Sequence, residues 1–164
     1  MILMGTIAGT SAYKIIISTS WTTSEGDEIA DGDIVYFFAE DYDKSVANSA
    51  KPKLSANRAF YIPTSIYNVS VTVKNAHVVA NQKGTATEEA DAIDDFFFQN
   101  NMAFGGSPLY LFIYHEADGK YRKLDWDSNK TPINYLACAV DGWNDHAEKG
   151  KMITYPSLKF NKAA

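Results

Sequence analysis

The stretch Asn68-Val69-Ser70-Val71-Thr72-Val73-Lys74 places a valine at every second position and a polar residue between each pair. Successive side chains of a β-strand point to opposite faces, so this alternation is typical of a strand with one buried face. Two earlier runs, at residues 13–19 and 34–38, are rich in the β-branched and aromatic residues that strands favour. The sequence therefore predicts a β-rich fold.

One segment after this strand has the pattern of a helix. Thr85 and Glu88 have the spacing of a capping box, in which two side chains bind orphan amides at a helix start. Ile93 and Phe97 contribute to an apolar stripe at helical spacing. We expect a helix over residues 85–101, ended by the glycines that follow it.

The second half of the chain again has the pattern of strands. A hairpin is expected over residues 109–126, because Asp118-Gly119 separates two apolar runs. Further strands are expected at residues 133–140 and 152–160. The whole order, strands then one helix then strands, lacks the alternation of helix and strand that a parallel sheet requires. It favours a mainly β (α+β) class, an antiparallel β-sandwich or barrel with one flanking helix.

The 164 residues fit a single domain. We expect an N-terminal arm at residues 1–10 and a long loop at residues 40–58, either flexible or containing a marginal strand. Residues 40–58 are small, polar and interrupted by Pro52. Loops of this length in compact domains usually have a function. The polar and acidic residues 21–33 are expected to form another loop.

Composition excludes several classes of function. The formal net charge is −5 and the chain has only two arginines, so it lacks the clustered cations that grip nucleic acid without regard to sequence. The apolar N-terminus has no basic leading segment, and no apolar stretch approaches the ~20 residues of a membrane-spanning helix. We expect a protein made in the cytoplasm without a signal peptide and without a membrane partner. The single cysteine, Cys138, has apolar neighbours and is expected in the core.

The residues that could carry chemistry do not form a recognisable centre. Asp141, Asp145 and His146 could converge on a divalent cation, but a solvated turn is the preferred interpretation. The acids of the early loop lack the pattern of a calcium site and are also interpreted as solvated; they are Asp27, Glu28, Asp31 and Asp33. We therefore predict no metal, no cofactor and no enzymatic activity, and keep an enzyme built on the acids and His146 as a hypothesis.

The tryptophans support a different alternative. Trp21, Trp126 and Trp143 lie in expected loops or at strand ends, where exposed rings could stack on a ligand. If they were exposed together, the chain would be a carbohydrate-binding or ligand-binding β-sandwich.

Two features favour self-assembly instead. The excursion over residues 41–57 is long enough to reach a neighbouring subunit, and strands at residues 13–19 and 151–160 lie near the termini. Edge strands expose backbone groups that pair readily with another chain. The expected subunit contacts are Met1, Ile2, Leu3, Met4, Asp41, Tyr42, Lys51, Pro52, Lys53 and Leu54.

This layout resembles the tail-tube proteins of long-tailed phages and the related tube protein of type VI secretion. The matching stretches are residues 68–74 as a core strand, 85–101 as the helix, 109–126 as the hairpin and 152–160 as the last strand. The resemblance rests on the order of elements and on no diagnostic motif.

The resemblance implies hexameric rings stacked into a hollow tube within a virion or another extracellular assembly. Strands from the subunits would form a continuous inner barrel, and residues 1–10 and 41–57 would contact the next ring. An acidic lumen would let DNA pass without adhering, because like charges repel. A capsid, pilus or adhesin subunit stays open, since all of these can be strand-rich.

Overall fold

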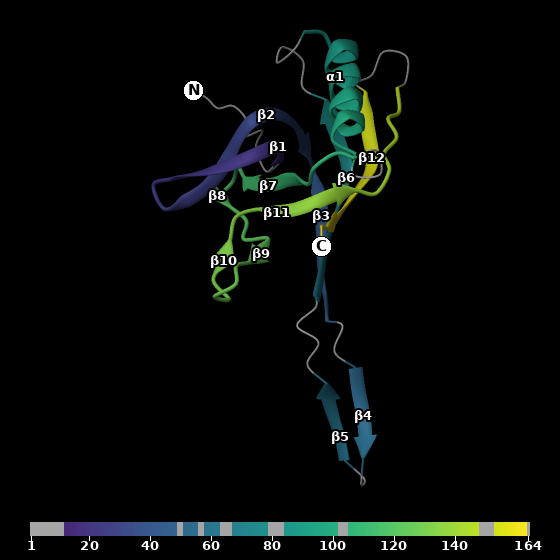
Figure 1. The fold of residues 1–164 in the computed structure, drawn as a ribbon. Helices are drawn as coiled ribbons and strands as arrows, with labels where there is room; N and C mark the ends of the chain where they lie inside the picture. The colour runs from purple at the N-terminus through teal and green to yellow at the C-terminus, as the bar shows by residue number, and fades with distance from the viewer. Residues whose placement is uncertain are drawn as a thin grey trace.

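The computed structural model describes residues 12–48, 51–55, 58–62, 67–78, 84–101, 105–147 and 153–163. A β-barrel, one helix beside it and a long two-stranded ribbon make up these residues (Figure 1). This confirms the expected class, a mainly β fold with antiparallel strands and one flanking helix.

Six strands form the barrel wall. They are β1 (Tyr13–Ser24), β2 (Asp27–Ala39), β6 (Tyr67–Val78), β12 (Thr154–Lys162), β11 (Leu136–Val140) and β7 (Leu109–His115), each hydrogen-bonded to the next. Antiparallel pairing of β1 with β7, from Tyr13 opposite His115 to Ser18 opposite Tyr110, closes the ring. Closure gives each of these six strands a partner on both sides over part of its length.

Closure corrects one expectation from the sequence. The strands near the termini were expected to offer open edges, but β1 pairs with both β2 and β7, and β12 pairs with both β6 and β11. β1 is paired on both sides from Tyr13 to Ser18, and β12 is paired with β6 along most of its length and with β11 opposite Phe160 to Lys162. These paired parts are not available to a second copy. The apolar sequence of both strands reflects burial in the barrel.

The remaining elements lie outside this ring. They are β3 (Asp41–Asn48), β4 (Lys51–Ser55), β5 (Arg58–Ile62), α1 (Ala86–Gln99), β8 (Lys120–Tyr121), β9 (Asp125–Trp126) and β10 (Pro132–Ile133). β3 pairs with β6, whereas β4 with β5 and β9 with β10 form small sheets of their own. β8 adds to the outer end of β7, as expected for the hairpin, but only over two residue pairs.

The expected loop at residues 21–33 is a hairpin instead. β1 and β2 stay paired to the turn at residues 25–26. Asn134 holds this end: its backbone N–H donates to Glu28 Oε1 at 3.1 Å, and its Nδ2 donates to Asp27 Oδ1 at 3.2 Å. The residues near the turn are mostly exposed, so they lack the apolar alternation by which a half-buried strand is recognised.

The alternating valines of β6 are buried as predicted, with no exposed surface at Val69, Val71 or Val73. They join a core to which α1 contributes Ile93 and Phe97, and the Phe97 ring lies 6.4 Å from that of Phe160 in β12. Each such fully buried side chain stabilises the fold by about 1.5–3 kcal/mol. Cys138 has no exposed surface and is a core residue, as expected.

The helix also has the predicted start. Thr85 is the N-cap, and its Oγ1 accepts from the Glu88 N–H at 3.3 Å while Glu88 Oε1 accepts from the Thr85 N–H at 3.0 Å. Hydrogen bonding of the Glu88 carboxylate to the backbone N–H of Thr85, and then to its side chain, lowers the pKa of Glu88. The capping box therefore determines where α1 begins.

Candidate interaction site

β3 extends the barrel wall into a ribbon. β3 and β6 pair without interruption from Asp41 opposite Lys74 to Asn48 opposite Tyr67. β2 pairs with β6 in the same register, with Phe37 opposite Val78, so β3 continues the pairing that β2 begins. The expectation of a loop over residues 40–58 is therefore wrong, because this segment contains β3 and β4.

The sequence hides β3 because much of it is exposed. Asp41, Asp43 and Val46 are all exposed, Val46 at 49%. The sequence of a strand with little buried surface lacks the alternation of apolar and polar residues, so it resembles the sequence of a polar loop. Among the described residues β3 pairs with β6 alone, so its outer edge carries backbone groups without a strand partner.

A partly buried ion pair anchors the ribbon to the barrel where β6 begins. Asp125 of β9 accepts from Tyr67 Oη and from Lys162 Nζ, both at 2.5 Å. Burial raises the pKa of Tyr67, and the hydrogen bond to Asp125 raises it further. Burial alone would lower the pKa of Lys162, but Asp125 and Tyr67 together outweigh burial and raise it. We call Tyr67, Asp125 and Lys162 the clamp.

Contacts from β3 reinforce the clamp. Lys44 Nζ lies 5.0 Å from the centre of the Trp126 ring and donates to the Lys123 carbonyl at 3.1 Å. Burial lowers the pKa of Lys44, and the positive charge of Arg122 lowers it further. Both strands of the ribbon are thus fastened to the segment between β8 and β10.

Tyr42, expected as a subunit contact, is engaged within its own chain. Its hydroxyl accepts from Arg122 Nη1 at 2.9 Å and is hydrogen-bonded to His115 Nε2 at 2.8 Å. Its ring packs edge-on against Tyr13, with ring centres 5.1 Å apart. Tyr42 therefore positions β3 on the barrel.

Beyond the ribbon lies a second two-stranded sheet, β4 and β5, which we call the tip hairpin. Figure 1 places it far from the barrel, at the opposite end of the molecule from α1. Its strands pair from Lys51 opposite Ile62 to Ser55 opposite Arg58. Residues 51–62 contain three cations and no acid, although the whole chain has a formal net charge of −5. The acidic excess therefore belongs entirely to the rest of the chain.

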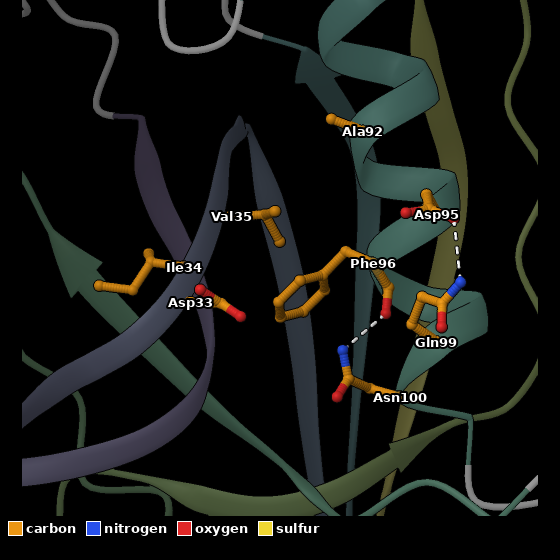
Figure 2. Close-up of a pocket in the computed structure, with 8 residues that line it drawn as sticks. All are labelled: Asp33, Ile34, Val35, Ala92, Asp95, Phe96, Gln99 and Asn100. Carbon is orange, nitrogen blue, oxygen red and sulfur yellow. Dashed lines mark hydrogen bonds between the residues drawn. The ribbon is translucent and has the colours of Figure 1, made fainter.

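A groove opens between α1 and β2 at the other end of the molecule. Its volume is about 330 Å³. The Phe96 ring reaches from the helix toward Val35, with Asp33 on the strand wall and Asp95 on the helix wall (Figure 2). Gln99 Nε2 donates to Asp95 Oδ1 at 3.4 Å. The groove thus combines an aromatic surface with two carboxylates.

Polar contacts on the inner side of α1 hold the helix wall of this groove. The Tyr155 hydroxyl of β12 donates to Asp94 Oδ1 at 3.2 Å and to the Ala90 carbonyl at 3.3 Å. Burial raises the pKa of Asp94 and the charge of Asp145 adds to this, whereas hydrogen bonds from Tyr155 and Trp143 oppose it. The position of Asp95, the next residue on α1, is therefore set by core contacts.

The other expected subunit contacts fall in two places. Lys51, Pro52, Lys53 and Leu54 lie in β4 of the tip hairpin, and Asp41 opens β3. Met1, Ile2, Leu3 and Met4, with the expected N-terminal arm, lie outside the described residues.

The structure does not bring the three tryptophans together. Trp21 stacks on Tyr135 with ring centres 4.8 Å apart, and Trp126 contacts Tyr67 of the clamp. Trp143 packs against Phe97 and the core. Each tryptophan therefore packs against a different partner, and Trp143 is engaged with the core.

The structure supports neither of the two metal sites that the sequence suggested, one near His146 and one at the acids of residues 27–33. Across the described parts of the chain, no group of three or more His, Cys, Asp or Glu side chains is placed to hold a metal ion. His146 instead forms a backbone bridge with Thr154, and Asp27 and Glu28 bind Asn134. Burial strongly raises the pKa of Cys138, which disfavours the nucleophilic thiolate.

The sequence predicted neither the clamp nor the groove. Tyr67, Asp125 and Lys162 are far apart in the chain, and only the pairing of β6 with β12 brings two of them together. Asp33 was considered only as part of an acidic loop. An acid placed between apolar residues, as Asp125 is between Leu124 and Trp126, is the one local signal that could have indicated a buried charge.

No helix among the described residues is long and apolar enough to cross a membrane. No protein-family model matches the chain, and no curated protein matches it in sequence.

Proposed function

We propose that the chain is a structural subunit that assembles with copies of itself into rings or a filament. The observation that carries this proposal is the tip hairpin, a two-stranded sheet separate from the barrel sheet. An isolated two-stranded hairpin is at best marginally stable in water, and three strands or a packing surface are needed for independent stability. A second copy would provide that surface.

The anchoring of the ribbon on the barrel favours a role for the tip hairpin in docking. The clamp fastens β6 where the ribbon leaves the barrel, and Lys44 and Tyr42 fasten β3. A projection fixed at its base loses less conformational freedom on docking than a flexible loop of equal length, so more of its contact energy appears as affinity.

The open outer edge of β3 is a second candidate contact. It replaces the terminal strands as the place where a neighbouring copy could add a strand to the sheet. The exposed Asp41 and Asp43 place negative charge on this strand, and charges on an edge strand are a common protection against unspecific pairing. Pairing there would therefore require a partner with matching charges.

Within this class, the resemblance to tail-tube proteins makes a tube of stacked rings in a virion the most specific form of the proposal. The acidic chain is compatible with a lumen that DNA passes without adhering. Capsid, pilus or adhesin subunits are the other forms.

The test compares the unaltered chain with a variant in which a Gly-Ser turn replaces residues 51–62. We expect the unaltered chain to form rings or filaments in negative-stain images and a large species in light scattering. The variant should remain monomeric and unfold at the same temperature as the unaltered chain, because the barrel does not include the tip hairpin. A matched variant with the same linker at residues 116–119 should still assemble. An unaltered chain that stays monomeric at high concentration overturns the proposal.

A further inference from the structure

A basic pocket lies at the turn between β7 and β8. Its volume is about 290 Å³, and it is lined by His115, Asp118, Lys120, Tyr121, Arg122 and Lys123. Three cations thus fall within four residues of a chain whose formal net charge is −5. Among the described residues, no carboxylate forms a salt bridge with any of these three cations. The pocket therefore carries positive charge that no ion pair in this part of the chain neutralises.

Backbone hydrogen bonds fix the shape of the pocket. His115 lies opposite Lys120 in the pairing of β7 with β8, and the Gly119 N–H donates to the His115 carbonyl at 2.9 Å. Beyond β8, the Arg122 N–H donates to the Ile113 carbonyl at 2.8 Å. The residues that carry the charge are therefore held on both sides of the turn before any ligand arrives.

The Arg122 side chain is oriented by Tyr42. Its Nη1 donates to Tyr42 Oη at 2.9 Å, and the same hydroxyl is hydrogen-bonded to His115 Nε2 at 2.8 Å. A guanidinium carries several N–H donors, so this hydrogen bond leaves others for a ligand. The charge of Arg122 also acts beyond the pocket, because it adds to burial in lowering the pKa of Lys44. A bound anion would reduce this repulsion.

The charge of the pocket matches a phosphate group. Lys120, Arg122 and Lys123 contribute +3 and Asp118 contributes −1, so the formal charge is +2 with His115 neutral. A phosphate monoester carries about −1.5 to −2 at pH 7 and has three strong acceptor oxygens. A carboxylate has a single charge and only two oxygens. Arginine binds phosphate through two parallel hydrogen bonds, which fixes the orientation of the group.

We propose that this pocket binds the phosphate group of a small phosphate monoester, with Arg122 as the orienting donor and Lys120 and Lys123 as flanking charges. The volume is at the lower limit of small-molecule pockets, so it suits the phosphate group rather than a whole large ligand. Binding to a nucleic acid would instead require a row of such phosphate contacts. The site does not depend on self-assembly, because it shares no residue with the tip hairpin.

Calorimetric titration of the full chain at constant ionic strength tests the site. The probes are inorganic phosphate, ribose 5-phosphate and ribose. We expect saturable binding of both phosphates and none of ribose. The double variant Lys120→Gln/Lys123→Gln should weaken phosphate binding by about tenfold or more, since each substitution removes a charge from the pocket. Lys130→Gln/Lys159→Gln changes the net charge equally at two exposed lysines outside the pocket and should leave the affinity nearly unchanged.

Asp118 gives a second test of opposite sign. Asp118→Asn removes the only carboxylate that lines the pocket, so phosphate should bind several-fold more tightly. The turn should persist, because Asn before Gly suits a hairpin turn as well as Asp does. Glu116→Gln makes the same change in net charge at an exposed residue that does not line the pocket, and it should have little effect.

Three results would overturn the proposal. The first is the absence of saturable binding of either phosphate probe. The second is an equal response of a pocket variant and its matched control, which would show that only the net charge matters. The third is a short DNA duplex that binds more tightly than ribose 5-phosphate, which would assign the charges to a nucleic acid instead.

Discussion

Asp94 carries its negative charge in surroundings that disfavour it, because burial and the charge of Asp145 raise its pKa. In the unfolded chain the carboxyl returns to its ordinary pKa. Between these two values the folded state binds more protons than the unfolded state, so this group makes the fold more stable as pH falls through that window. The loss of stability caused by the ionised Asp94 is therefore complete at neutral pH and disappears in acid.

We expect Asp94→Asn to raise the free energy of unfolding at neutral pH and to lose this advantage at about pH 4 and below. The amide oxygen can still accept the hydrogen bond from Tyr155. Urea unfolding across this pH range measures the effect, and Asp95→Asn on the exposed side of the same helix is the control. An advantage that is constant with pH would contradict this explanation.

Lys162 has the opposite effect, because it neutralises a buried charge. The Asp125 side chain is 5% exposed, and Lys162 is its only ion-pair partner among the described residues. Lys162→Met would leave a buried carboxylate without a counter-charge and should cost about 3 kcal/mol of stability. Urea unfolding checks this value, with the exposed Lys159→Met on the same strand as control. Adding Asp125→Asn to Lys162→Met should recover part of the loss, and no recovery would refute the ion-pair explanation.

Among the elements, α1 follows its local sequence most closely. Thr85 accepts a hydrogen bond from a first-turn amide, so Thr85→Ala should lower the free energy of unfolding by about 1 kcal/mol. Thermal or urea unfolding measures this loss, and Thr87→Ala, exposed within the first turn, should change stability much less. Equal effects of the two substitutions would show that the cap does not determine the start of the helix.

The elements also show where sequence reasoning succeeds. Val69, Val71 and Val73 were recognisable because one face of β6 is buried, and α1 because its capping box is local. β3 was not recognisable, because Asp43 and Val46 are exposed and such residues do not alternate between apolar and polar types. Strand pairing there depends on β6, whose paired residues lie from 19 positions (Asn48 to Tyr67) to 33 positions (Asp41 to Lys74) further along the chain.

At the scale of the whole molecule, charge is divided between two ends. The tip hairpin contains Lys51, Lys53 and Arg58 without an acid, whereas the groove presents Asp33 and Asp95. If the basic tip hairpin binds an acidic surface of a neighbouring copy, assembly should weaken as salt is added, because salt screens exposed charges. Light scattering from low salt to about 1 M salt measures this, and assembly that strengthens throughout would indicate an apolar interface instead.

The sequence contained the charges of this site but not their arrangement. Lys51 and Lys53 were expected as contacts because they lie in a long polar segment. The groove could not be predicted, since Asp33 and Phe96 belong to β2 and α1, and only the packing of the helix beside the barrel makes them neighbours. Sites made by elements distant in sequence require the fold.

The pairing of β1 with β7 has a consequence for how the chain acquires its structure. Tyr13 lies opposite His115, so the first strand finds this partner only after about a hundred further residues have been synthesised. Proteins dominated by such non-local pairings have high contact order and typically fold in milliseconds to seconds, because the entropy of closing a long loop is lost before the contacts form. Until the ring closes, β1 is a nascent apolar strand with one vacant edge, and this interval is when the chain is most prone to aggregate.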